Sequence, residues 1–469
     1  MKKITQFIIM AGLVTGLSSC EKYLDVNTNP NAATKPPIKG LLSRVTYDAA
    51  QNVFRVSNIT SYYVQYLSSP NAASPADTYE PIDASGTWTE LYDNMSDAYD
   101  LHQLGVENGS TQYQGVAKVL QAMDLIHVHD LWGAAPFSNA FTGASVAPTY
   151  DNAETIYASI LKLLDDGIAL LGQTPAGTTL PTDNSDLIHN GNVASWVRTA
   201  HALKARMLNR VSKTTNYNAS AVLAEVEAAY TAPGQDAAIR TFDVRNPWCQ
   251  VAVNNQALLL DGWLSEQLID AMNGKSFGIF DKRLEKMTDP TKFGDYRGTP
   301  NGRGRSGSGI NNEECYINTT GYYSSTGSPL YIASLEEVRF IEAEAALRAG
   351  NRERAYAAYL KGIRESFDKM GVAAADRDAY LNDASVAVGS DALTLELIFK
   401  EKYKALFLSP ETWSDARRAD YQYKDFGLPL NASTSAFVRR LVYPTVETSR
   451  NGANAPDITD VTSRLWWDR

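Results

Sequence analysis

Cysteine is scarce in this sequence, with 3 in 469 residues. So few cysteines cannot form a disulfide scaffold, and an apolar core must therefore supply the stability of the fold. Apart from Cys20, only Cys249 and Cys315 are present, and their spacing does not reveal whether they are bonded to each other. Hydrophobic residues make up 44% of the chain, which is enough for one large core or two fused ones.

The chain also lacks an excess of positive charge and any long apolar run. Its formal net charge is −10, and it becomes −12 if Lys2 and Lys3 are removed with a leader. Such an acidic body argues against nucleic acid and against docking on anionic lipid headgroups. The mean hydropathy is −0.28, and nothing after the first residues resembles a membrane span. Neutral ligands, peptides and protein partners remain as candidates.

The common catalytic motifs are missing as well. Neither a G-x-S-x-G nucleophile elbow nor an H-E-x-x-H zinc helix occurs. Residues 302–307 match G-x-G-x-x-G, but no apolar strand precedes them and no helical pattern follows, so we interpret them as a flexible loop. The start of a calcium loop at 25–29 has prolines where glycine and glutamate are required. No cofactor is expected, although a glycosidase with an unrecognised carboxylate pair stays possible.

Two histidines form a further candidate metal site that we reject. His127 and His129 follow an apolar pattern with helical spacing. Residues two apart on a helix point in nearly opposite directions, so the pair cannot easily share one ion. We interpret both as structural histidines at a helix end beside Asp130 and Trp132.

The N-terminus has the three regions of a secretory signal. Lys2 and Lys3 provide the positive start, residues 7–14 form a short apolar stretch, and small residues lead to Cys20. This arrangement predicts a bacterial lipoprotein signal at 1–19, with the lipid on Cys20. An ordinary signal with an incidental cysteine is disfavoured, because Cys20 stands where cleavage is expected.

The rest of the chain is divided as follows. Residues 20–39 are rich in Asn, Pro and Thr and are expected to form a tether, and 40–469 a single helical domain. Helices are predicted from apolar spacing around 156–164, 196–207, 338–345, 356–370 and 397–406. Asn192, and Asp151 with Glu154, are expected to cap two of them. Residues 335–349 and 352–370, separated by Gly350, predict an antiparallel helical hairpin of roughly tetratricopeptide size.

Long polar connections separate these helices, and several contain aromatic residues. The connections span 68–87, 174–192, 292–331 and 425–460. Loops of that length in a compact domain usually carry function. Aromatic rings offer apolar faces to sugar rings, so the candidate ligand-binding residues are Trp88, Tyr296, Tyr322 and Tyr323. Trp88 also starts a stripe with helical spacing, which favours core packing for that residue.

Several short motifs follow one another along the chain in a fixed order. They are the mature start at 20–31, Asp-Leu-Trp-Gly-Ala-Ala-Pro-Phe at 130–137, the helix at 337–345, and the segments at 401–407, 413–418 and 440–451. This ordered set resembles the SusD/RagB family of nutrient-binding outer-membrane lipoproteins, in particular its SusD-like branch. Charged residues in these motifs, such as Arg339, Glu342 and Glu344, or Asp415 with Arg417 and Arg418, are expected to make ion pairs that fix helix packing.

The resemblance implies a mostly α, SusD-like helical fold, with tetratricopeptide-like hairpins and long irregular ligand-binding loops. It also implies a partner, a SusC-like TonB-dependent barrel in the outer membrane, and an oligosaccharide or peptide ligand captured outside the cell without catalysis. The membrane would be reached through the lipid anchor alone. Two alternatives stay open: a surface glycan hydrolase, and a structural lid that binds no ligand itself.

Overall fold

The computed structural model describes most of the chain, namely residues 36–72, 74–256, 262–306 and 312–469. The predicted signal at 1–19, Cys20 and most of the tether at 20–39 lie outside the described residues. Helices dominate the described part, and the prediction of a mostly α fold with helical hairpins and long irregular loops is confirmed.

The helices lie in the following order. They are α2 (Ile38–Tyr63), α3 (Ser85–Glu107), α4 (Thr111–Leu131), α5 (Ala153–Leu171), α6 (Val193–Arg210), α7 (Ala219–Ala228), α8 (Pro247–Gln256), α9 (Glu266–Met272), α10 (Leu335–Arg348), α11 (Arg352–Lys369), α12 (Ala374–Asn382), α13 (Leu395–Ala405), α14 (Glu411–Arg418) and α15 (Thr445–Asn451). Two short 3₁₀ helices are Leu284–Lys286 and Trp466–Asp468. The strands are β1 (Leu67–Ser68), β2 (Ala237–Ile239), β3 (Trp263–Leu264) and β4 (Leu330–Ala333), and they pair antiparallel as β1–β3 and β2–β4.

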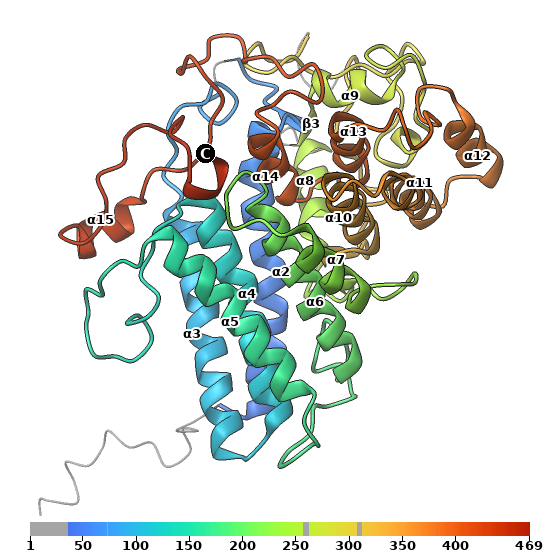
Figure 1. Ribbon diagram of the computed structural model, residues 1–469. Coiled ribbons are helices and arrows are strands. Elements are labelled where there is room, and N and C mark those ends of the chain that lie inside the picture. The colour runs from blue at the N-terminus through green and yellow to red at the C-terminus, as the bar shows by residue number, and fades with distance from the viewer. Residues whose placement is uncertain (1–35, 73, 257–261, 307–311) are drawn as a thin grey trace, which may run out of the picture.

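The long helices α2 to α5 form a bundle on one side of the molecule (Figure 1). α4 contacts α2, α3, α5 and α6, and every residue from 119 to 131 is buried. This segment is apolar around most of its circumference, as expected for a helix enclosed by others. One of its buried polar residues is Asp124, whose carboxylate accepts hydrogen bonds from the side-chain amides of Asn52 at 2.9 Å and Asn94 at 2.7 Å.

The predicted hairpin is confirmed as α10 and α11. Gly350 between them has φ +80°, the left-handed conformation that ends a helix at low cost for glycine. The side chain of Asn351 then caps α11 by accepting from the backbone N–H of Arg354. The helices approach closely: a Cβ added at Gly362 would stand 2.9 Å from the Phe340 ring.

Buried ion pairs join the helices, as the motifs indicated. Arg418 of α14 pairs with Glu344 of α10 at 2.6 Å and with Asp415 at 2.6 Å. Arg339 pairs with Glu342 at 3.2 Å, but within α10 and with both side chains partly exposed. Arg417 differs from the expectation: its guanidinium lies 3.5 Å from the Trp413 ring centre and donates to backbone carbonyls.

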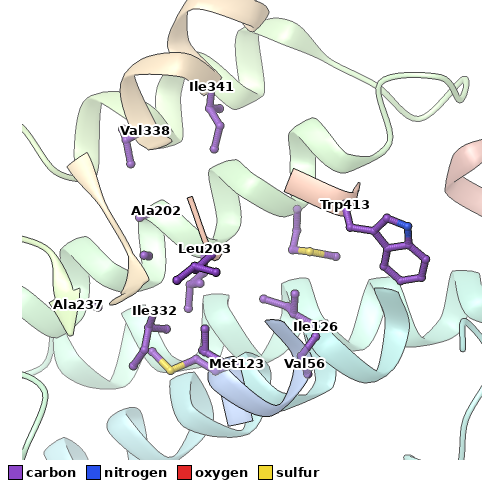
Figure 2. Close-up of a cluster of buried hydrophobic side chains, with 14 of the residues drawn as sticks. Val56, Met123, Ile126, Ala202, Leu203, Ala237, Ile332, Val338, Ile341 and Trp413 are labelled. Atoms are coloured by element: carbon purple, nitrogen blue, oxygen red, sulfur yellow. The ribbon is translucent and has the colours of Figure 1, made fainter. Parts of the chain in front are cut away.

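One hydrophobic cluster links the two sides of the molecule (Figure 2). It contains Val56 of α2 and Ile126 of α4 from the bundle, and Leu203 of α6, Ile341 of α10 and Trp413 of α14 from the other side. Since residues far apart in sequence share this cluster, the bundle and the hairpins pack against a common core.

Some local expectations need correction. Asn192 caps α6 as predicted, but α5 is capped by Asn152, not by Asp151. The Asp151 carboxylate instead accepts from the backbone N–H groups of Phe137 and Ser138, which fixes the preceding loop. The connection at 425–460 is not wholly irregular, because it contains α15.

Candidate functional site

A cavity of about 910 Å³ opens between the loop after α9 and the helix α12. Both helices are labelled in the upper right of Figure 1. A second cavity of about 470 Å³ adjoins the first and shares Asn273, Lys275 and Tyr296 in its lining. Together they form what we call the loop cavity. Volumes of this size suit ligands of several sugar or amino-acid units.

Aromatic rings provide the apolar surface of the loop cavity. The rings of Phe280 and Tyr296 lie 5.6 Å apart at an interplanar angle of 57°, and both are partly exposed. Their backbone is held by Asn273, which forms an antiparallel bridge with Phe280 and donates a side-chain hydrogen bond to the Tyr296 carbonyl at 3.1 Å. Phe293 is 56% exposed at the edge, with the Arg297 guanidinium 4.6 Å from its ring centre. Flat apolar faces are therefore presented to a ligand.

The opposite wall is α12, anchored by a buried polar network. The hydroxyl of Tyr380 donates to Glu401 at 3.0 Å and accepts from the Lys404 ammonium. Arg283 lies in the same network, paired with Asp281 at 2.6 Å. Burial, and then the neighbouring carboxylates, hold the pKa of Tyr380 well above its usual range, so the phenol stays a donor. This network makes α12 a fixed wall.

Ion pairs surround the rim of the loop cavity. Lys275 pairs with Asp270 at 2.6 Å, and Lys282 with Glu285 at 2.6 Å. The hydrogen bond with the Asp270 carboxylate raises the pKa of Lys275. Arg297 and Asp295 form a further pair at 2.6 Å. These groups can donate to and accept from hydroxyl or amide groups of a ligand.

The four aromatic residues predicted from the sequence do not line one cavity. Tyr296 lies in the loop cavity. Trp88 is in α3, is 5% exposed, and packs edge-on against Trp132 at 4.9 Å. It borders a separate cavity of about 290 Å³ with Tyr92 and Phe141. The core-packing interpretation of Trp88 is thus the better description of its surroundings.

Tyr322 and Tyr323 lie together, but mostly under the surface. Tyr323 is 9% exposed and borders a cavity of about 40 Å³, room for only one or two water molecules. Its ring is 5.0 Å from that of Tyr322 and nearly perpendicular to it. The hydroxyls of Tyr322 and Tyr331 share a hydrogen bond of 2.7 Å. Of the four candidates, Tyr296 therefore has the most suitable position for ligand contact.

Several residues of the loop cavity escaped the sequence analysis. Phe293 lies in the same polar connection, 292–331, as Tyr296 and is visible there as a further aromatic residue. Phe280 precedes that connection, in the loop after α9. Asp376 and Tyr380 come from α12, and Asp383 is the residue that follows it, about a hundred residues away; no local pattern connects them to the loop.

The sites rejected from sequence have structural roles. Burial lowers the pKa of His127 to about 4, and His129 is 3.3 Å from the Asp130 carboxylate. Within the described residues, no group of three or more His, Cys, Asp or Glu side chains is placed to hold a metal. Gly302 of the G-x-G-x-x-G segment donates its N–H to Asp77 at 2.5 Å, which fastens that loop. Cys249 and Cys315 are both free thiols and buried.

Comparison with known proteins gives a consistent result. A family model described as SusD-like, "Starch-binding associating with outer membrane", matches residues 30–444. No curated protein sequence matches the chain.

Solved structures with the same fold extend over nearly the whole chain. A SusD/RagB family protein from Bacteroides thetaiotaomicron is 20% identical with a TM-score of 0.73, covering 92% of this chain and 99% of that one. A chitin-binding SusD homologue from Flavobacterium johnsoniae is 21% identical with a TM-score of 0.73, covering 92% and 98%. A SusD homologue from Bacteroides fragilis is 20% identical with a TM-score of 0.74, covering 93% and 100%.

Proposed function

This chain belongs to the SusD-like family, and from that membership we propose that it is a non-catalytic, cell-surface binding lipoprotein. It captures glycans, or other nutrients such as peptides, and passes them to a SusC-like TonB-dependent barrel. The family is described as starch-binding and associated with the outer membrane, and one neighbour of the same fold binds chitin. The lipid on Cys20 holds the body at the outer face of the outer membrane. No helix of the described residues is long and apolar enough to cross a bilayer.

The observation that carries the proposal is the aromatic lining of the loop cavity. Phe280, Phe293 and Tyr296 place three rings along one opening, and ion-paired polar groups surround them. A sugar ring has apolar C–H faces and hydroxyls around its edge. Its faces can pack on the three aromatic rings, while its hydroxyls form hydrogen bonds with the polar groups at the rim of the cavity. Such a shallow site gives modest affinity, which suits capture followed by release.

A hydrolase is less well supported. Glycoside hydrolysis commonly needs two carboxyl groups across the scissile bond, one of them with a raised pKa so that it can donate a proton. In the loop cavity, hydrogen bonds from Thr291 and Ser385 lower the pKa of Asp295 and Asp383 respectively. Burial raises the pKa of Asp77 and Asp124 in the interior, and of Asp93 at the separate cavity beside Trp88, but these three carboxylates lie outside the loop cavity.

The proposal is tested by replacing Tyr296 with alanine. Binding to soluble starch, chitin oligosaccharides and a wider glycan and peptide panel is measured by isothermal titration calorimetry. Loss of one stacking ring should weaken binding about tenfold, equivalent to about 1 to 1.5 kcal/mol. Tyr322→Ala is measured alongside, because Tyr322 is also a ligand residue predicted from the sequence; it lies outside the loop cavity, so its loss should weaken binding less than that of Tyr296.

The matched control is Tyr356→Ala, which removes a partly exposed tyrosine from α11, away from the loop cavity. Unchanged affinity in Tyr296→Ala, with an unchanged melting temperature, would reject this site. Turnover of any glycan by the purified wild-type protein would favour the hydrolase. Co-purification with a barrel, without binding to any glycan or peptide, would favour a structural lid.

A further inference from the structure

The charges around the loop cavity are unevenly distributed. Its lining contains eight carboxylates, namely Glu266, Asp270, Glu285, Asp295, Glu313, Glu314, Asp376 and Asp383, and four cations, namely Lys275, Lys282, Arg297 and Arg303. The formal charge of the lining is therefore −4. Two carboxylates for each cation exceed the proportion in the whole chain, which has 53 acidic and 43 basic residues. The excess of negative charge is thus concentrated where a ligand would bind.

Most of the cations are already engaged by carboxylates of the same lining. Lys275, Lys282 and Arg297 each have a carboxylate oxygen at 2.6 Å. In the part of the chain that the structure describes, Arg303 is the one lining cation with no carboxylate within ion-pair distance. An anionic ligand would consequently have to displace existing ion pairs to find partners.

Two carboxylates at α12, in contrast, form no ion pair with any other described residue. Within the described residues, no Lys or Arg lies within 4 Å of Asp376 or Asp383. Asp383 is held in position by the backbone N–H of Ser385 at 2.8 Å and its hydroxyl at 2.6 Å. Both carboxylates border the same opening as Phe280 and Tyr296. The wall opposite the rings therefore bears two carboxylates that lie outside the described ion pairs. Besides the hydrogen bonds from Ser385, the charge of Lys400 still lowers the pKa of Asp383. Besides the hydrogen bond with Glu285, the charge of Asp376 raises the pKa of Lys282.

We propose that the loop cavity selects uncharged or cationic glycans and excludes anionic ones, such as uronate-rich or sulfated chains, through the carboxylates of Asp376 and Asp383. This inference rests on the proposed function of the cavity and specifies its substrate class. Repulsion acts at the rim before the ligand is desolvated, so it lowers the affinity for an anionic chain that has the same shape. A cationic amino sugar would instead gain from the unpaired carboxylates.

The test compares pairs of polysaccharides with one backbone and different charge. Hydroxyethyl and carboxymethyl derivatives of starch, chitin and cellulose are immobilised, and binding of the protein is followed by biolayer interferometry. The hydroxyethyl group is a neutral substituent of similar size, so each pair isolates charge. We expect at least about tenfold tighter binding to a hydroxyethyl derivative at low salt, with the ratio falling towards one in about 0.5 M NaCl.

Two double variants separate the local effect from the net charge of the protein. Asp376→Asn with Asp383→Asn removes the two carboxylates at α12 and should reduce the discrimination several-fold. Asp100→Asn with Asp457→Asn removes two exposed carboxylates elsewhere, changes the net charge by the same amount, and should leave the discrimination unchanged. An asparagine at position 383 keeps a side-chain oxygen that can still accept from Ser385, so the loop is retained.

Each outcome decides a separate point. Equal or tighter binding to carboxymethyl derivatives overturns the charge selection while leaving glycan capture intact. Discrimination that persists unchanged in the α12 double variant overturns the role of Asp376 and Asp383. Absence of binding to every neutral, cationic and anionic glycan overturns glycan capture itself, and the selection with it.

Discussion

Replacement of Asp124 by asparagine should stabilise the protein, and the gain should grow as the pH rises. Asp124 is fully buried in α4 between α2 and α3. Burial raises the pKa of its carboxyl to about 7 from the ordinary 3.8, although hydrogen bonds from Asn52 and Asn94 act in the opposite direction. The nearest charged groups are Asp48, which raises the pKa further, and Arg55, which lowers it.

The sign of the effect follows from proton linkage. The folded state binds the proton of Asp124 more tightly than the unfolded chain does. The contribution of this group to the free energy of unfolding is therefore largest below pH 3.8 and is lost as the pH rises through about 7. Between about pH 5 and pH 8, the loss amounts to about 2 to 3 kcal/mol for a group with these two pKa values. An asparagine at position 124 has no such titration, so its advantage over aspartate should increase by this amount.

The geometry suggests that an asparagine can be accommodated. The side-chain oxygen of the new asparagine can accept from Asn52. Its NH2 group, however, would face the NH2 group of Asn94, which in the wild-type protein donates to Asp124 at 2.7 Å. The side-chain oxygen of Asn94 is buried without a hydrogen-bond partner among the described residues. Rotation of the Asn94 amide would bring this oxygen towards the new amide at position 124, in exchange for the long hydrogen bond of 3.4 Å that the Asn94 amide now donates to the Val45 carbonyl.

The assay is denaturant unfolding of wild type, Asp124→Asn and the control Asp100→Asn at four pH values from about 5 to about 8, the range in which the linkage acts. Asp100 is an exposed residue of α3, and its replacement should give the same small effect at each pH. A difference between Asp124→Asn and wild type that is constant with pH, or that shrinks as the pH rises, would refute the reasoning.

Two further predictions concern a buried ion pair and the two cysteines. Arg418→Ala should lower stability by about 3 kcal/mol, the lower end for breaking a buried pair, because the Glu344 and Asp415 carboxylates lose their shared partner but keep Arg348 at 3.0 Å and Lys402 at 2.7 Å; a loss below about 1 kcal/mol in urea unfolding would contradict this. In protein that begins after Cys20, neither Cys249 nor Cys315 should react with iodoacetamide at about pH 8 until the chain is unfolded, since both are buried and burial raises the pKa of Cys315 to about 12. Mass spectrometry should then find both alkylated without added reductant, and a need for reductant would indicate a disulfide.

Local features of the fold could be predicted from the sequence because they depend on neighbouring residues. The α10–α11 hairpin follows from apolar spacing and from one glycine able to adopt φ +80°. The cap at Asn192 depends on its side chain accepting a hydrogen bond from the backbone N–H of Ser195, only three residues further along the chain. Asp151 was misjudged for a related reason: Asn152 is an equally good capping residue, and the contact of Asp151 with residues 137 and 138 is not visible locally.

The candidate site depended on contacts between distant segments. The sequence by itself determined the helices of recognisable period, the motifs in family order, and the aromatic residues in polar connections. It could not separate the partly exposed Tyr296 from the buried Trp88 and Tyr323, because exposure is set by what packs against a ring. Only the tertiary structure placed α12, with its two unpaired carboxylates, across the opening from Phe280 and Tyr296, since the Tyr380 network fixes that helix about a hundred residues further along the chain.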